Sequence, residues 1–151
     1  LTVLETNESI EDALEARSIF EQALIEPVID RLTPKKLRHI ETILKEMSPP
    51  VRNKAYDRYI EVNTKFHLAI AEATDNPLIV RVVELLLTVT RQDLWKKVII
   101  DYFLSDKRKL QASFDEHQQI VQAIKEKNVV RARRVMEAHF ATVWKILQDG
   151  V

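Results

Sequence analysis

Three histidines and one asparagine are spaced so that they could bind a single metal ion. His117 lies eleven residues before Asn128, and His139 lies eleven residues after it. If Asn128 marks the turn of an antiparallel helical hairpin, both histidines sit at equal height, roughly 16 Å from the turn. Asn63 and His67 are four residues apart, so they share one face of a helix. Imidazole binds zinc, nickel, copper and iron, and three protein ligands with an open position are typical of a metal ion that accepts a further ligand.

A purely structural role is the alternative for each of these side chains. A single histidine on an apolar helix face is more often a hydrogen-bonded core residue than a metal ligand. The presence of three, two of them level across a turn, puts the metal site on an equal footing with the structural role. Arg17 and Glu21 are spaced for an ion pair within one helix, and we interpret them as a structural or interface pair. We interpret Trp95 and Trp144 as packing or interface residues, and His39 as exposed to solvent.

The composition narrows the class of protein. The 151 residues carry 23 basic and 23 acidic side chains, so a globally basic nucleic-acid surface is absent. There is no cysteine, which excludes a disulfide framework and a thiolate zinc finger. The single glycine, Gly150, excludes glycine-rich phosphate loops. No apolar run reaches membrane-spanning length. The chain begins with Leu1, and we therefore expect it to be part of a longer protein.

Apolar periodicity predicts about six helices that must position the candidate ligands. Phe66 and Ile70 recur at a helical step in the stretch that carries Asn63 and His67. Pro27 is expected to bend or divide the first helix. No strand-like alternation is present, so the predicted fold class is all-α, an antiparallel bundle of about six helices. The predicted helices span about residues 10–32, 34–47, 59–77, 77–100, 105–127 and 129–147, with a stop at 48–50 and a loop near 102–106.

Helix starts are marked by residues that can cap them. Ser9, Thr33 and Asn76 each precede a predicted helix, and their side-chain oxygens can accept hydrogen bonds from its first turn. Pro34 and Pro77 follow the last two, in a position where a helix needs no amide proton.

Three motifs resemble the C-terminal effector-binding (FCD) domain of the FadR subfamily of GntR-type bacterial transcription regulators. They are FHLAIAEATDNP (66–77), EHQQIVQAI (116–124) and the A-R-x-x-M-E-A-H run that ends at His139. The resemblance implies a helical bundle that forms a homodimer in the cytoplasm. It also implies that residues 1–9 are a linker from a missing N-terminal winged-helix DNA-binding domain, that this domain alone contacts operator DNA, and that residues 10–151 form the effector-binding and dimerisation domain.

Many members of this family bind a divalent metal ion through one aspartate and three histidines, at the base of a pocket for a small organic acid. By position, the resemblance assigns the histidines to His67, His117 and His139, with zinc or nickel as the expected metal. Asn63 stands where the family has its aspartate. A neutral amide oxygen is a weaker ligand than a carboxylate, so we expect weaker metal binding or a greater need for an anionic effector. Gln22 stands where the resemblance places an arginine that contacts the effector.

The function that follows is a sensor and not an enzyme. A small organic acid binds at the metal, the bundle shifts, and the separate DNA-binding domain changes its hold on DNA. Two alternatives stay open. A metal-dependent hydrolase would use the open coordination position to activate water. A dimerisation bundle with a decayed metal site would explain Asn63 without any ligand.

Overall fold

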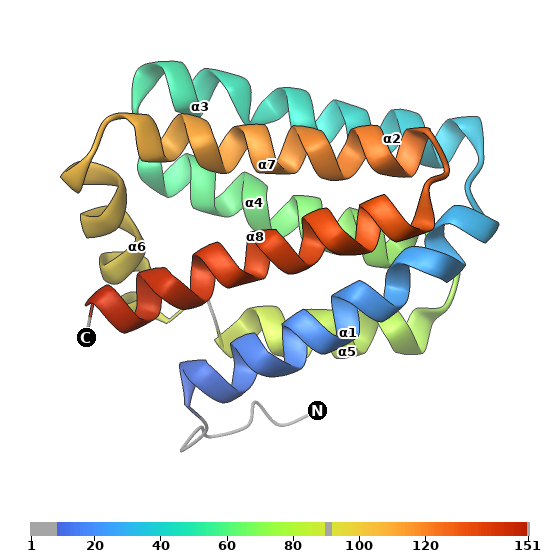
Figure 1. Ribbon diagram of the computed structural model, residues 1–151, viewed down its shortest axis with the longest axis horizontal. Coiled ribbons are helices and arrows are strands. Elements are labelled where there is room, and N and C mark those ends of the chain that lie inside the picture. Colours follow the sequence, from blue (N-terminus) through green and yellow to red (C-terminus); the bar gives the residue numbers. More distant parts are fainter. Residues whose placement is uncertain (1–8, 90–91, 151) are drawn as a thin grey trace.

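The computed structural model describes residues 9–89 and 92–150, and the regular structure in these ranges is entirely α-helical. The all-α prediction is therefore confirmed. No helix in the described ranges combines the length and the apolar character that a bilayer crossing requires. Figure 1 shows the helices, which are α1 (Ile10–Asp30), α2 (Pro34–Glu46), α3 (Ser48–Asn53), α4 (Tyr56–Glu72), α5 (Pro77–Val89), α6 (Asp93–Ser105), α7 (Arg108–Lys125) and α8 (Val129–Gly150).

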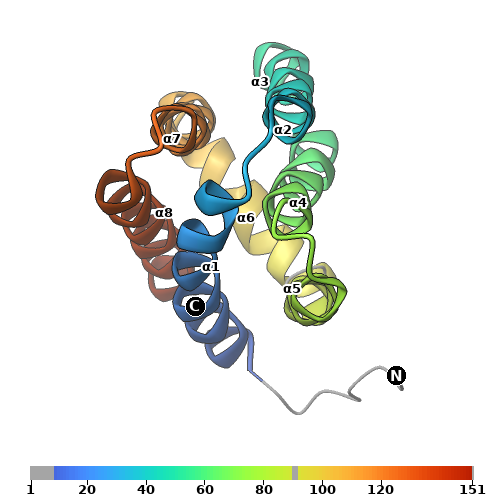
Figure 2. The ribbon, with the colours of Figure 1, turned by 90° about the vertical axis from the view of Figure 1, so that its right-hand side faces the viewer.

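The helices form a bundle that is closed at one end by a crossing helix. α7 and α8 run side by side as a hairpin, α1 lies along α8, and α4 lies against α2 and α5 (Figure 1). In the end-on view of Figure 2, α6 crosses obliquely behind the other helices. Because α6 also contacts α4, α7 and α8, it covers that end of the bundle.

The core lies along the apolar stripe of α4. Phe66 and Ile70, which the periodicity placed inward, are completely buried. Burial of side chains of this size stabilises the fold by about 1.5–3 kcal/mol each. His67 follows Phe66 and is also buried, at 1 % exposure, so this polar ring lies inside the bundle.

Pro27 does not divide the first helix, which runs without interruption from Ile10 to Asp30. Proline removes one backbone hydrogen bond and crowds the preceding turn. Residues on both sides of Pro27, Leu24, Ile25 and Val28, are buried in the same core cluster. Their packing holds the helix together across the proline.

Two helix boundaries differ from the sequence prediction. α2 ends at Glu46, next to the predicted stop, but the 48–50 stretch itself begins the short helix α3, since prolines are accepted in a first helical turn. The predicted 77–100 helix is two helices, α5 and α6, and residues 102–105 of the predicted loop belong to α6. Apolar residues continue at a helical period on both sides of this break, so periodicity carried no signal of it.

The predicted N-caps are confirmed. The Ser9 hydroxyl accepts a hydrogen bond from the Asp12 backbone amide at 3.0 Å, and the Thr33 hydroxyl accepts one from the Lys36 backbone amide at 3.2 Å. The Asn76 side chain accepts one from the Leu78 amide at 3.0 Å. Of the predicted linker 1–9, only Ser9 lies inside the described residues.

Candidate metal and effector site

Three histidines from three different helices meet inside the bundle. His67 is on α4, His117 on α7 and His139 on α8, and none is more than 4 % exposed. Their ring centroids are 4.6 Å apart for His117 and His139, 5.3 Å for His67 and His139, and 5.8 Å for His67 and His117. One ring nitrogen from each lies within 4.8 Å of the other two. The expected convergence of the three rings is confirmed.

The α7–α8 hairpin explains how two of these rings meet. Asn128 accepts a hydrogen bond from the Arg131 amide at 3.0 Å and so caps α8. Lys127 takes a left-handed backbone conformation, φ 54°, that reverses the chain. His117 and His139 are equidistant from this turn and therefore reach the same level of the bundle.

The Nδ1 atom of each histidine is held by an oxygen acceptor. His67 Nδ1 lies 2.5 Å from Glu21 Oε1, His117 Nδ1 lies 2.6 Å from the Ser113 carbonyl oxygen, and His139 Nδ1 lies 2.9 Å from Glu116 Oε2. These acceptors assign a proton to each Nδ1, which directs the three Nε2 atoms to act as metal ligands. Outer hydrogen bonds of this kind orient nearly all metal-binding histidines.

The Nε2 atoms lack the partners that a metal-free core would need. His67 Nε2 is buried and has no hydrogen-bond partner among the described residues. His117 Nε2 lies 2.6 Å from Asn63 Oδ1, although neither atom carries a proton when Nδ1 is the donor. A cation bound by both atoms removes this conflict. If the Asn63 amide were turned over, its NH2 group would donate to His117 and no metal would be needed. Titration of the metal-free chain with zinc distinguishes a bound cation from a turned amide.

Burial keeps the His67 and His117 imidazoles neutral and ready to bind a metal. Loss of water lowers the pKa of His67 to about 4 and that of His117 well below its usual range. Burial acts to raise the pKa of Glu21, but the His67 N–H and Arg17 outweigh it and bring that pKa down to about 2. Glu21 is therefore an ionised carboxylate, held at 3.0 Å by Arg17 Nε.

The metal-free chain is expected to lose stability as the pH falls from 7 to 5. The pKa of His67 is about 4 in the folded chain and about 6.5 in the unfolded chain. The stabilisation is complete above pH 6.5 and is lost below it, because the unfolded chain binds a proton that folded His67 refuses until about pH 4. At pH 5, His67 alone lowers the free energy of unfolding by about 2 kcal/mol. Urea denaturation at both pH values measures this loss. His67→Gln should reduce it, and equal stability of the native chain at pH 7 and 5 would contradict it.

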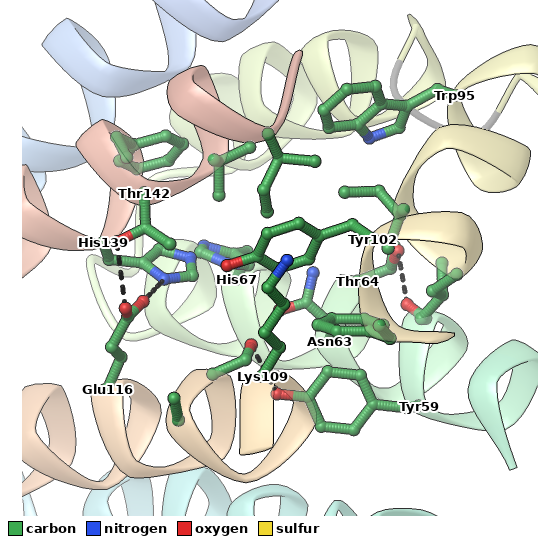
Figure 3. A pocket seen from close by; sticks show the side chains of 18 of the residues that line it. Tyr59, Asn63, Thr64, His67, Trp95, Tyr102, Lys109, Glu116, His139 and Thr142 are labelled. Carbon is green, nitrogen blue, oxygen red and sulfur yellow. Dashed lines mark hydrogen bonds and ion pairs between the residues drawn. The ribbon is translucent and has the colours of Figure 1, made fainter. Parts of the chain in front are cut away.

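A cavity of about 80 Å³ opens beside the histidines. His67, His139 and Asn63 line it at one end (Figure 3). Volume of this kind holds on the order of five to eight water molecules, which suits a small organic acid. Helices α1, α4, α6, α7 and α8 contribute its other walls, with polar or aromatic side chains from Arg17, Tyr59, Trp95, Tyr102, Lys109 and Thr142.

Several site residues escaped the sequence analysis. Arg17 and Glu21 form the expected ion pair, but Glu21 also contacts His67 and Arg17 lines the cavity. The position of both residues on the apolar arc of their helix could have indicated that they face the interior. Glu116 holds His139 across the hairpin, and their similar distances from Asn128, twelve and eleven residues, could have indicated this contact. Gln22 donates a hydrogen bond to Ser18 Oγ at 2.9 Å and is not among the residues that line the cavity.

Residues 12–142 match the model of the family described as the FCD domain. The chain is 27 % identical over 149 residues to the HTH-type transcriptional regulator LutR of Bacillus subtilis, and this alignment covers 96 % of this chain and 65 % of that protein. It is 29 % identical over 134 residues to the Uxu operon regulator of Haemophilus influenzae, and this alignment covers 87 % of this chain and 48 % of that protein. The chain thus spans between about half and two thirds of the length of these curated relatives.

Solved structures share the fold. E. coli McbR/YncC superposes with a TM-score of 0.79 at 17 % identity, covering 97 % of this chain and 71 % of that one. Streptococcus agalactiae GntR superposes with a TM-score of 0.72 at 20 % identity, covering 94 % of this chain and 60 % of that one.

Proposed function

Because the chain belongs to the FCD domain family, the effector-binding domains of GntR-type transcription regulators, we propose that it senses a small organic acid at a divalent metal ion. His67, His117 and His139 would hold zinc or nickel through their Nε2 atoms, and Asn63 through its amide oxygen. The observation that carries the proposal is the shared arrangement of the three rings. Each Nδ1 is held by an oxygen acceptor, and His67 Nε2 is buried without a partner among the described residues.

The charge of the proposed site favours an anionic effector. Three neutral imidazoles and a neutral amide leave the two positive charges of the ion uncompensated. The ion, when bound, supplies a Lewis-acid centre that attracts a carboxylate oxygen. Arg17 lines the same cavity and adds a guanidinium group, of which only Nε is engaged by Glu21. A small carboxylate is therefore the ligand class that the cavity fits best.

The hydrolase alternative lacks a free general base. A catalytic base must be able to accept a proton from water. Of the two carboxylates at the histidines, Glu116 accepts hydrogen bonds from His139 and Thr142, and Glu21 is held by Arg17 and His67. Among the described residues at the cavity both are committed to holding other side chains, which favours a sensor over an enzyme.

Regulation would follow from a difference in affinity. An effector that binds one arrangement of the bundle more tightly than another shifts the population towards it, and its differential affinity limits the size of the shift. We place the response in a cytoplasmic homodimer, with operator DNA bound by a separate winged-helix domain.

Asn63→Asp is expected to tighten zinc binding by at least about tenfold. The substitution replaces a neutral ligand oxygen with an anionic one next to a dication, which is a favourable charge interaction in a buried site. Isothermal titration of the metal-free chain with zinc measures the change. Asn53→Asp adds the same charge at an exposed position on α3 and should leave zinc affinity unaltered.

Two results would reject the metal proposal. One is an aspartate variant that binds zinc no more tightly than the native chain. The other is a native chain, purified without a tag or chelator, that contains no metal by elemental analysis and binds no zinc. The second result would instead support the dimerisation bundle with a decayed site, with the Asn63 amide turned over to donate to His117.

A further inference from the structure

Lys109 carries a positive charge at the cavity that no carboxylate offsets directly. It lies on α7, and its amine donates a hydrogen bond to Ser105 Oγ at 2.7 Å and sits 4.1 Å from the centroid of the Tyr102 ring. Within the described part of the chain, no ion pair involves Lys109. The other cation at the cavity, Arg17, is paired with Glu21. Among the described residues, Lys109 is therefore the cavity cation that has no carboxylate partner.

The Asn63 amide nitrogen offers a second donor to the same space. Asn63 Oδ1 faces His117, so its NH2 group faces the opposite way. Within the described residues this NH2 group has no acceptor in hydrogen-bond range. Figure 3 shows the Lys109 amine and the Asn63 amide both reaching into the cavity. An aspartate at position 63 would present no donor there.

The formal charges around the cavity favour a ligand with two negative charges. By formal charge, the carboxylates of Glu21 and Glu116 balance Arg17 and Lys109, and these four charged side chains line or adjoin the cavity. The two charges of a divalent ion are then left over, because Asn63 is neutral. A monoanion would leave one positive charge uncompensated in a largely buried cavity, which is unfavourable.

The remaining walls restrict what lies between the two negative groups. Apolar side chains of Ile60, Ile99, Phe103, Val143 and Ile146 line the cavity. The volume of about 80 Å³ leaves room for only a few carbon atoms beside two carboxylates.

We propose that the effector is a short dicarboxylate of about three to five carbons. One carboxylate occupies the metal at the three histidines, and the other is held by the Lys109 amine and the Asn63 NH2 group. This inference rests on the proposed function and specifies its ligand. The charged hydrogen bonds to Lys109 and the balance of charge select the dicarboxylate over a monocarboxylate of the same length.

Calorimetric titration of the zinc-loaded chain with matched acids tests this assignment. The pairs are malonate with propionate, succinate with butyrate, and glutarate with valerate, at constant ionic strength because charged contacts are screened by salt. We expect the best dicarboxylate to bind at least about tenfold more tightly than the monocarboxylate with which it is paired. This difference is the size expected for one charge-assisted hydrogen bond to a half-buried lysine. Elemental analysis after each titration verifies that the acid has not removed the zinc.

Lys109→Met should reduce that preference to less than about threefold while leaving the zinc affinity and the monocarboxylate affinity unchanged. Lys107→Met removes the same charge from an exposed neighbour that does not line the cavity, and should keep the full preference. Equal binding of the two acids in every pair, or a preference that survives Lys109→Met, overturns the dicarboxylate assignment and leaves the proposed function standing. If the chain binds zinc but no acid of either series, the proposed function fails together with the assignment.

Discussion

Replacing His139 by alanine is expected to weaken zinc binding by at least about 100-fold. The loss of an outer hydrogen-bond partner alone costs roughly 10- to 100-fold in metal affinity, and the loss of a direct ligand costs more. His139 is held in place by Glu116 at 2.9 Å and stacks on His67 with ring centroids 5.3 Å apart, so its ring is fixed beside the other two proposed ligands. Competition with a chromophoric chelator measures the affinity of both proteins.

His39→Ala is the matched control for this loss. His39 is 55 % exposed and lies 3.5 Å from Glu72, away from the cavity. Its removal should leave zinc affinity within about twofold of the native value, as expected for a surface side chain without a buried partner. Native-like zinc affinity in His139→Ala would show that the three rings do not share an ion.

Glu21→Leu is expected to lower the free energy of unfolding of the metal-free chain by about 3–5 kcal/mol. Glu21 is 1 % exposed and Arg17 6 % exposed. Removal of the carboxylate leaves the guanidinium buried without its partner, and it takes the acceptor from His67 Nδ1. The double variant Arg17→Met/Glu21→Leu should recover much of the loss, because replacing a buried ion pair by apolar side chains is often tolerated. Urea denaturation of the native chain, the single variants Arg17→Met and Glu21→Leu, and the double variant gives the coupling energy of the pair.

Glu26→Leu provides the comparison for a surface pair on the same helix. Glu26 is 57 % exposed and lies 2.8 Å from Arg133. An exposed pair of this kind contributes about 0–1 kcal/mol, so this variant should stay close to the native stability. If Glu21→Leu is no less stable than Glu26→Leu, the buried pair does not contribute as its geometry indicates.

The meeting of the three histidines could be predicted because it depends on local geometry. A fixed rise per residue puts His117 and His139 at the same height of any antiparallel hairpin that turns at Asn128. His67 needed one further condition, that the apolar face of its helix should point to the same core. These constraints are contained in the spacing of the residues.

The parts that escaped prediction depend on how distant helices pack. The sequence spacing joins Arg17 to Glu21, but only the position of α1 against α4 brings Glu21 to His67. Glu116 is next to His117 in the sequence, but its hydrogen-bond partner, His139, is on the following helix. The division between α5 and α6 allows α6 to cover the end of the bundle, and the apolar period of that stretch is the same on both sides of it.

Because the chain has no cysteine, no disulfide bond cross-links its helices. An ion shared by residues 67, 117 and 139 would cross-link three helices, joining points 50 and 22 residues apart along the chain. Cross-links over segments of this length restrict the unfolded chain, as disulfides do, but this one opens when the metal leaves. The rigidity of the bundle would then vary with the metal supply of the cell, independently of any acid that it detects.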